Sequence, residues 1–235
     1  MIVDFDVYYR EYLGCRTFDD IYVRSLYRDM PINANYYYPF VRSSYKSKVI
    51  TSVSSQIYHN DYRYLSDKDI CDLSLDELNR IYPSVQYKEF YRYSTDDKLV
   101  SDCCSACILK DEYKEFFMRS GKNTDPVFKE NKWLKLKKYI EEENMFVSVF
   151  DNKIVSTCKI SDIYCGGANL YVHTDEVYRN KGFGKDVVSL AINTCIERGI
   201  RPIYFVEKGN ISSQKLAESL GFKLKAKEYC FCIVK

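Results

Sequence analysis

The chain has 235 residues, of which 46% are hydrophobic and 29% charged, and its formal net charge is +2. This balance is typical of a globular protein and excludes a disordered chain, and so small a charge gives no electrostatic basis for binding nucleic acid or an anionic membrane. No apolar run approaches the ~20 residues that cross a bilayer, and the start lacks the basic-then-apolar layout of a secretory signal. We therefore expect a cytoplasmic protein without nucleic-acid or membrane partners.

The chain contains ten cysteines. In the absence of a secretory signal, reduced thiols are a better interpretation than a disulfide framework. Cys103, Cys104 and Cys107 have a spacing that resembles a set of metal ligands. A zinc site needs four ligands, however, and His59 and His173 are the only histidines in the sequence. We predict no metal site and expect most of the thiols to behave as small buried hydrophobes.

The first 95 residues contain no motif that indicates chemistry. Imperfect helical periodicity predicts a helix over 1–28, and Pro31 and Pro39, at the edges of 33–40, predict a loop or short extended piece there. Residues 48–53 are rich in β-branched side chains and predict a strand. A Ser-x-x-Glu capping box within 67–82 predicts a short helix. We interpret 1–95 as an N-terminal extension or a partial second domain.

A polar stretch at 93–98 predicts a domain boundary, so that 96–235 forms the second domain. After it we expect α/β structure with a mixed sheet. The predicted strands are 99–109, 145–150, 154–160, 169–174, 203–206 and 223–234, and the predicted helices are 111–118, 128–143, one whose apolar face runs over 187–195, and 210–222. Residues 151–153 join two of these strands as a hairpin, and Asn210 or Ser212 caps the last helix.

The segment Arg179-Asn-Lys-Gly-Phe-Gly184 lies between a predicted strand and a predicted helix. Its glycines allow close approach of the backbone to a ligand, while the free N–H groups and the dipole of the helix start favour an anion. Lys181 and Lys185 add positive charge. Two known glycine motifs are excluded. The dinucleotide-binding motif needs a third glycine that is missing here, and the triphosphate-binding loop needs Ser or Thr at the position of Asp186. We predict a diphosphate-binding turn; the alternative is a solvated basic surface.

The R-x-x-G-x-G pattern of this turn, with the order of strands and helices around it, resembles the GNAT superfamily of acyl-CoA-dependent N-acyltransferases. The segment from Asn210 through Ser213 to the Leu-Gly-Phe that ends at Phe222 resembles the second motif of that family. The resemblance covers 96–235. Within the superfamily the chain is most similar to the zwittermicin-resistance-type branch, whose members also have a long N-terminal extension.

The resemblance implies acetyl-CoA as donor and a primary amine of a small molecule as acceptor. It implies that the end of one strand pairs with the pantetheine arm, that the glycine turn holds the diphosphate, and that the second motif contacts the lower cofactor arm, although Asn210 and Ser213 also fit a plain helix cap. The predicted cofactor-binding residues are Val172, His173, Thr174, Arg179, Asn180, Lys181, Gly182, Phe183, Gly184, Lys185, Asn210 and Ser213.

The implied reaction is direct attack of a neutral amine on the thioester, which needs a group to accept the amine proton and an acid for the thiolate. Where many relatives have a catalytic tyrosine this chain has Ala217, and where many have a strand glutamate it has Ala168 and Asn169. The remaining catalytic candidates are His173, Tyr171, Glu207 and Tyr229. Two alternatives follow: an acyl-CoA-binding module without catalysis, or a protein lysine acetyltransferase.

Overall fold

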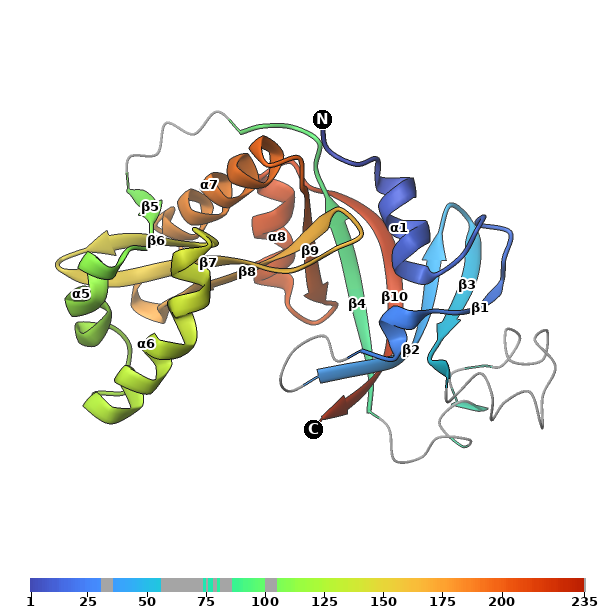
Figure 1. Cartoon of the computed structure of the whole chain (residues 1–235), viewed down its shortest axis with the longest axis horizontal. Coiled ribbons are helices and arrows are strands. Elements are labelled where there is room, and N and C mark those ends of the chain that lie inside the picture. Colours follow the sequence, from blue (N-terminus) through green and yellow to red (C-terminus); the bar gives the residue numbers. More distant parts are fainter. Residues whose placement is uncertain are drawn as a thin grey trace. The chain divides into compact units, whose positions relative to one another are not determined.

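The computed structural model describes residues 1–30, 36–55, 74, 76–77, 80, 86–99 and 105–234. Its fold is mixed α/β, as predicted (Figure 1). The chain divides into two compact units. The first unit comprises Met1–Ile2, Thr95–Tyr204 and Lys215–Phe222, and the second comprises Val3–Ser94, Phe205–Gln214 and Lys223–Lys235. Two C-terminal segments that the sequence assigned to 96–235 therefore group with the first strands of the chain.

The sheet of the first unit is antiparallel except at one strand pair. Its strands β5 (Ala106–Ile108), β6 (Met145–Phe150), β7 (Lys153–Tyr164) and β8 (Gly167–Thr174) lie side by side in this order. The first residues of β9 (Arg201–Glu207) run parallel to β8, and helix α7 (Phe183–Glu197) supplies the crossover that a parallel pair requires. Asp151 and Asn152 have φ values of 52° and 56°, as a tight two-residue hairpin demands.

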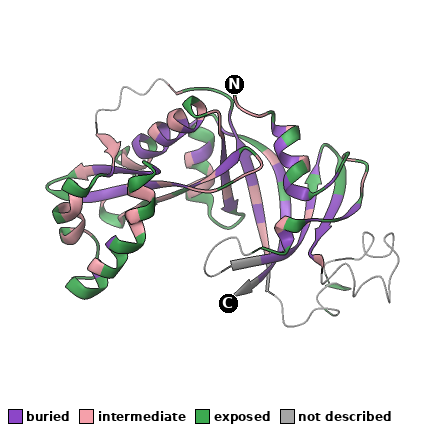
Figure 2. Cartoon of the chain, in the orientation of Figure 1, coloured by how far each residue is buried: buried purple, intermediate pink, exposed green. Residues whose placement is uncertain are grey.

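The core of the first unit includes two groups of buried residues. The buried side chains of α7 include Val187, Val188, Ala191, Ile192 and Cys195. Elsewhere Trp133, on α6 (Pro126–Glu141), is 1% exposed and packs in a cluster with Leu109, Met145, Val147 and Ile154. Figure 2 shows that the buried residues follow the strands and one side of α7. The apolar periodicity of the sequence predicts Trp133, Val187, Ala191 and Cys195 among these positions.

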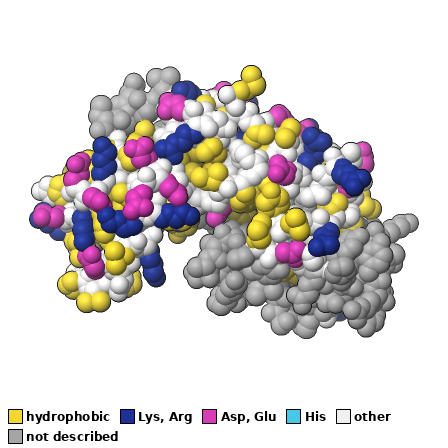
Figure 3. All heavy atoms as spheres, viewed as in Figure 1, with side chains coloured by type: hydrophobic (Ala, Val, Ile, Leu, Met, Phe, Trp, Pro, Cys, Tyr) yellow, Lys and Arg dark blue, Asp and Glu magenta, His cyan; other side chains and the backbone are white. Residues whose placement is uncertain are grey.

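The surface of α6 and its neighbours is charged but not of one sign. The 3-10 turn Asp111–Tyr113 leads into α5 (Lys114–Arg119), and Lys and Arg side chains alternate with Asp and Glu side chains over α5 and α6 (Figure 3). Lys114 pairs with Glu130 at 2.7 Å and Lys137 with Asp111 at 2.5 Å. Exposed pairs of this kind contribute at most about 1 kcal/mol each, so they serve solubility more than stability.

The second unit combines the beginning and the end of the chain. Its strands lie in the order β1 (Tyr22–Arg24), β3 (Lys48–Val53), β2 (Tyr36–Tyr45), β10 (Lys223–Val234), β4 (Gln86–Ser94). Helix α1 (Phe5–Leu13) buries Phe5, Tyr8, Tyr9, Tyr12 and Leu13. Helix α8 (Ile211–Ser219) begins in this unit and ends in the first. The last strand of the chain is thus hydrogen-bonded on both sides by strands from the first 95 residues.

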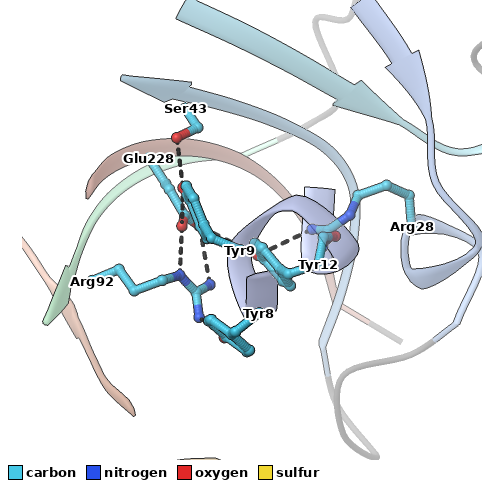
Figure 4. A network of polar contacts seen from close by, with 7 residues as sticks. All are labelled: Tyr8, Tyr9, Tyr12, Arg28, Ser43, Arg92 and Glu228. Atoms are coloured by element: carbon cyan, nitrogen blue, oxygen red, sulfur yellow. Dashed lines mark hydrogen bonds and ion pairs between the residues drawn. The ribbon is translucent and has the colours of Figure 1, made fainter. Parts of the chain in front are cut away.

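A buried ion pair lies at the centre of the second unit. Arg92 of β4 donates from Nε to Glu228 Oε1 of β10 at 2.6 Å, and the two side chains are 1% and 0% exposed. Tyr9 and Tyr12 of α1 donate to the two carboxylate oxygens of Glu228 at 2.8 and 3.2 Å, and Arg92 also donates to the Tyr8 hydroxyl (Figure 4). These hydrogen bonds offset the cost of removing both charges from water.

Arg28 and Ser43 extend the same network. Arg28, on the 3-10 turn Leu26–Arg28, donates to the hydroxyl and the carbonyl of Tyr12, both at 3.2 Å. Ser43 of β2 lies 2.5 Å from the Tyr9 hydroxyl (Figure 4). Both guanidinium groups lie over the Tyr12 ring, with centroid distances of 4.1 Å for Arg92 and 4.3 Å for Arg28. Side chains from α1, the 3-10 turn, β2, β4 and β10 therefore share one set of hydrogen bonds.

The predicted helices and strands are confirmed from residue 106 onward and are less accurate before it. The strand at 48–53 is confirmed, but a helix over 1–28 is wrong beyond Leu13, because Tyr22 and Val23 enter the sheet and become buried. Of the two alternatives for 33–40, the extended one is confirmed from Tyr36, where β2 begins. The capping box is present, with Ser74 and Glu77 joined through side chain and backbone. Most of 67–82, and residues 100–104 of the predicted strand 99–109, lie outside the described residues.

We expect Arg92→Met to lower the free energy of unfolding of the second unit by about 3–5 kcal/mol, because it leaves the Glu228 carboxylate buried without a counter-charge. Denaturant titration followed by circular dichroism measures this change. The matched control is Lys98→Met, which removes an exposed pair with Glu197 and should cost less than about 1 kcal/mol. A loss for Arg92→Met as small as that of the control would contradict a central role for the buried pair.

Candidate active site

The end of β8 presents the strand residues of the predicted site. Its parallel pairing with β9 covers Gly167 to Asn169 and ends there, whereas its antiparallel pairing with β7 continues to Thr174. Residues 170–174 of β8 therefore lie beyond the region paired with β9, in which the last β9 residue is Ile203. A backbone edge of this kind can pair with an extended ligand.

Tyr171 and His173 project from one face of β8, since they are two residues apart. Tyr171 is 65% exposed, lies opposite Lys159 of β7, and has the Lys159 ammonium 5.6 Å from its ring centroid. His173 is exposed, lies opposite Thr157, and has its Nε2 atom 3.3 Å from Asp175 Oδ1. Asp175 can therefore orient the imidazole, which leaves the other ring nitrogen for a substrate proton.

The predicted diphosphate turn forms the start of α7. Gly182 precedes the helix with φ 92° and ψ −23°, in the left-handed region that favours glycine, and no side chain caps the helix there. Lys185 and Asp186 donate their N–H groups to the Gly182 carbonyl. Among the described residues, the N–H groups of Gly182, Phe183 and Gly184 have no hydrogen-bond partner. Three donors and the positive end of the helix dipole thus remain for an anion.

Gly184 is required by a close approach to β8. A Cβ atom built on it would lie 3.1 Å from Thr174 Oγ1, and Thr174 is itself held by a 2.8 Å hydrogen bond to Ser156. The Arg179 Nε atom donates to the Thr174 carbonyl at 3.2 Å. The second glycine and the arginine of the motif thus both fix the turn against the end of β8.

The lysines at the turn are exposed to solvent, so an anion can reach them. Lys181 and Lys185 are both exposed, and the Lys181 ammonium lies 5.3 Å from the centroid of the Tyr178 ring. Asp186, in the first turn of α7, is buried and accepts a hydrogen bond from the Ser105 hydroxyl. The positive charges of this segment thus face solvent, while its carboxylate is buried.

The remaining candidates belong to the second unit. Asn210 Oδ1 accepts from the Ser213 N–H at 3.2 Å, so Asn210 is a cap of α8, which is one of the two roles considered for it. Glu207 is exposed and pairs with Lys88 at 3.2 Å. Burial, then the Glu89 carboxylate, raises the pKa of Tyr229 above its ordinary value. Tyr229 therefore keeps its proton near neutral pH and suits an acid better than a base.

The positions at which this chain departs from many relatives offer no acid or base. Ala217 on α8 and Ala168 on β8 are 0% and 1% exposed. Asn169 donates from Nδ2 to Asp162 Oδ2 at 3.2 Å. The sequence did not single out Phe150 and Tyr178, whose rings contact Phe183 of the turn. No local pattern could have found them, since Phe150 lies on a hairpin far from the turn in sequence.

The described cysteines are free thiols, and most of them are buried. Burial raises the pKa of Cys195 to about 12 and those of Cys158 and Cys230 still further above the ordinary value. In the part of the chain that the structure describes, no group of three or more His, Cys, Asp or Glu side chains could hold a metal ion. Cys103 and Cys104 lie outside that part. No helix within it is long and apolar enough to cross a membrane.

Comparison with known proteins adds evidence that the geometry alone does not provide. A family model described as GNAT acetyltransferase matches residues 32–231. Uncharacterized N-acetyltransferase YdfB of Bacillus subtilis (strain 168) is 24% identical over 188 residues, which cover 80% of this chain and 69% of YdfB. The crystal structure of a GCN5-related N-acetyltransferase from Sphaerobacter thermophilus has a TM-score of 0.50 at 11% identity, covering 83% of this chain and 76% of that one. This likeness concerns the fold, and it confirms the predicted acyltransferase architecture.

We expect Cys158, Cys195 and Cys230 to resist alkylation by iodoacetamide at pH 8 in the folded protein, because their raised pKa values keep the thiols protonated and burial excludes the reagent. Half-buried Cys107 and Cys165 provide the comparison. Peptide mass spectrometry, with a denatured sample as the fully labelled reference, identifies the modified sites. Labelling of Cys158 as fast as that of Cys165 would contradict the burial described.

Proposed function

The chain belongs to the GNAT acetyltransferase family, and we propose that it is an acetyl-CoA-dependent N-acetyltransferase that acts on a primary amine of a small molecule. The single observation that carries this proposal is the start of α7, where three unpartnered N–H groups lie beside exposed Lys181 and Lys185. Main-chain donors at a helix start suit a diphosphate, which is the charged part of coenzyme A. The zwittermicin-resistance-type branch and the small acceptor are part of the same proposal.

The residues of the turn and of β8 fit the coenzyme in two ways. The N–H groups of Gly182, Phe183 and Gly184 would bind the diphosphate, and a side chain at Gly182 would stand among them. The backbone of 170–174 extends beyond the register with β9 and would pair with the pantetheine arm, which is linear and carries amide groups. Val172, His173 and Thr174 would make these strand contacts.

The acetyl group itself would come from the thioester of the bound coenzyme. His173 would accept the proton of the attacking amine, since Asp175 lies 3.3 Å from its Nε2 atom and can hold the ring in place. A backbone N–H of β8 would polarise the thioester oxygen. Tyr171, which lies on the same strand as His173, is the other candidate for these proton transfers within the first unit, while Glu207 and Tyr229 belong to the second unit and stay sequence predictions.

An acyl-CoA-binding module without catalysis is the second candidate function. The observation that favours it is the pair Ala168 and Ala217, buried alanines at the positions where many relatives have acid–base side chains. An assay of thiol release with acetyl-CoA and a panel of primary amines separates the two. Stabilisation by acetyl-CoA without turnover of any amine would favour the binding module. Turnover of a lysine peptide, but of no small amine, would favour a protein lysine acetyltransferase.

We expect Gly182→Asp to weaken acetyl-CoA binding by at least a hundredfold, because it places a carboxylate among the donors for the diphosphate and strains a backbone with φ 92°. Isothermal titration calorimetry measures the affinity. The matched control is Gly121→Asp, at a glycine with φ 76° and open space around it among the described residues, so that it introduces the same charge and a similar strain outside the proposed site. Wild-type affinity in the Gly182 variant would end the assignment of the turn.

We expect His173→Ala to lower kcat at least tenfold while changing the Kd of acetyl-CoA less than threefold, because the imidazole would act on the amine proton and only its backbone would contact the coenzyme. Steady-state kinetics on an amine identified in the panel, with calorimetry alongside, separates the two effects. Thr157→Ala, opposite His173 on β7, is the control for a local change in the strand pair. Equal losses in kcat and affinity would assign His173 a packing role.

A further inference from the structure

Three aromatic rings meet beside the proposed diphosphate turn. Phe150 lies at the end of β6, Tyr178 lies just before the turn, and Phe183 is the first residue of α7. Their centroids are separated by 5.9 Å for Phe150 and Tyr178, 5.7 Å for Phe150 and Phe183, and 6.2 Å for Tyr178 and Phe183. We call these residues the aromatic triad. It brings a hairpin and the turn together although they are far apart in sequence.

The side chains of the aromatic triad are more exposed to solvent than those of a hydrophobic core. Phe150 is 53% exposed, and Tyr178 and Phe183 are half-buried. By contrast, Val187, Val188 and Ile192 on the inner face of α7 are fully buried. Leaving large aromatic surface in water forgoes the free energy that burial would provide. A cluster of such residues next to a binding segment therefore indicates a ligand surface.

The ring geometry leaves faces available for stacking. The interplanar angles are 61°, 54° and 74°, so each pair meets tilted or edge to face, not as parallel plates. Such contacts use the edges of rings and leave faces uncovered. The Lys181 ammonium lies near the Tyr178 ring and adds positive charge beside the cluster. A planar, electron-rich group attached to a phosphate would match both features.

We propose that the aromatic triad binds the adenine base of coenzyme A by stacking, chiefly on Phe150. This inference rests on the proposed function, in which Gly182, Phe183 and Gly184 bind the diphosphate. The adenine is joined to the diphosphate through a single ribose, so the base must lie close to the turn, where the described residues place these three rings. The pantetheine arm, at the other end of the diphosphate, is linear and suits the edge of β8 instead.

Calorimetry with two ligands tests the stacking directly. Acetyl-CoA carries the adenosine part, whereas acetyl-4′-phosphopantetheine lacks it but keeps the pantetheine arm and one phosphate. We expect Phe150→Ala to weaken acetyl-CoA binding roughly tenfold, which is the effect of losing one base–aromatic stack, and to leave the affinity for acetyl-4′-phosphopantetheine unchanged. Phe150→Trp should retain the affinity for acetyl-CoA, because it keeps a ring face.

The control variant is Phe128→Ala on α6, which removes a phenylalanine that is 48% exposed and outside the aromatic triad. It should change neither affinity. Equal weakening of both ligands by Phe150→Ala would overturn the inference, since the ring would then only support the turn. Unchanged affinity for acetyl-CoA would overturn it as well, and if the KM of the amine rose instead, the rings would belong to the acceptor.

The same measurements distinguish failure of this inference from failure of the proposed function. Binding of neither ligand to the wild-type protein would overturn the proposed function and the stacking together. Binding of acetyl-CoA that Gly182→Asp abolishes, but that Phe150→Ala leaves unchanged, would overturn the stacking alone. Thermal unfolding of each variant verifies folding, and the exposure of Phe150 predicts little change in its melting temperature.

Discussion

The buried pair of Arg92 and Glu228 is the interaction on which the arrangement of the second unit depends. Two charges removed from water are stable only with a complete set of hydrogen bonds, and here Tyr8, Tyr9 and Tyr12 of α1 supply much of it. Burial, the largest effect, lowers the pKa of Arg92, but Glu228 and the neighbouring tyrosines together raise it well above its ordinary value. Because β4, β10 and α1 must meet for this network to form, the beginning and the end of the chain fold as one unit.

The same network bears on the structural role of the first 95 residues. The sequence favoured an extension or a partial second domain for 1–95, and the family resemblance was confined to 96–235. In the structure, β2 and β4 pair with β10 on its two sides, and the family model matches from residue 32. Residues 36–94 therefore supply both neighbours of the last strand and lie within the range of the family match. We propose that the acyltransferase domain includes this part of the chain.

The candidate site depends on a second and more local constraint, the backbone conformation at the start of α7. Gly182 adopts a left-handed conformation, and Gly184 leaves space for the Thr174 hydroxyl, so that the first N–H groups of the helix stay free in the described structure. Free main-chain N–H groups depend on no particular side chain, which is why a short glycine motif could predict this backbone conformation. Proton transfer, in the function that we propose, would require a particular side chain, and the buried alanines Ala168 and Ala217 provide none.

The sequence by itself determined the elements of 106–234, the hairpin at Asp151 and Asn152, and the glycine turn, because apolar periodicity and local backbone preferences encode these features within a few residues. Only the tertiary structure decided that Tyr22 and Val23 form a strand, that β10 lies between β2 and β4, and that Phe150 contacts Phe183. These depend on contacts between segments far apart in the chain. These contacts form because they bury apolar faces and give buried polar groups their hydrogen-bond partners. The sequence of a single segment does not show which distant segment will do this.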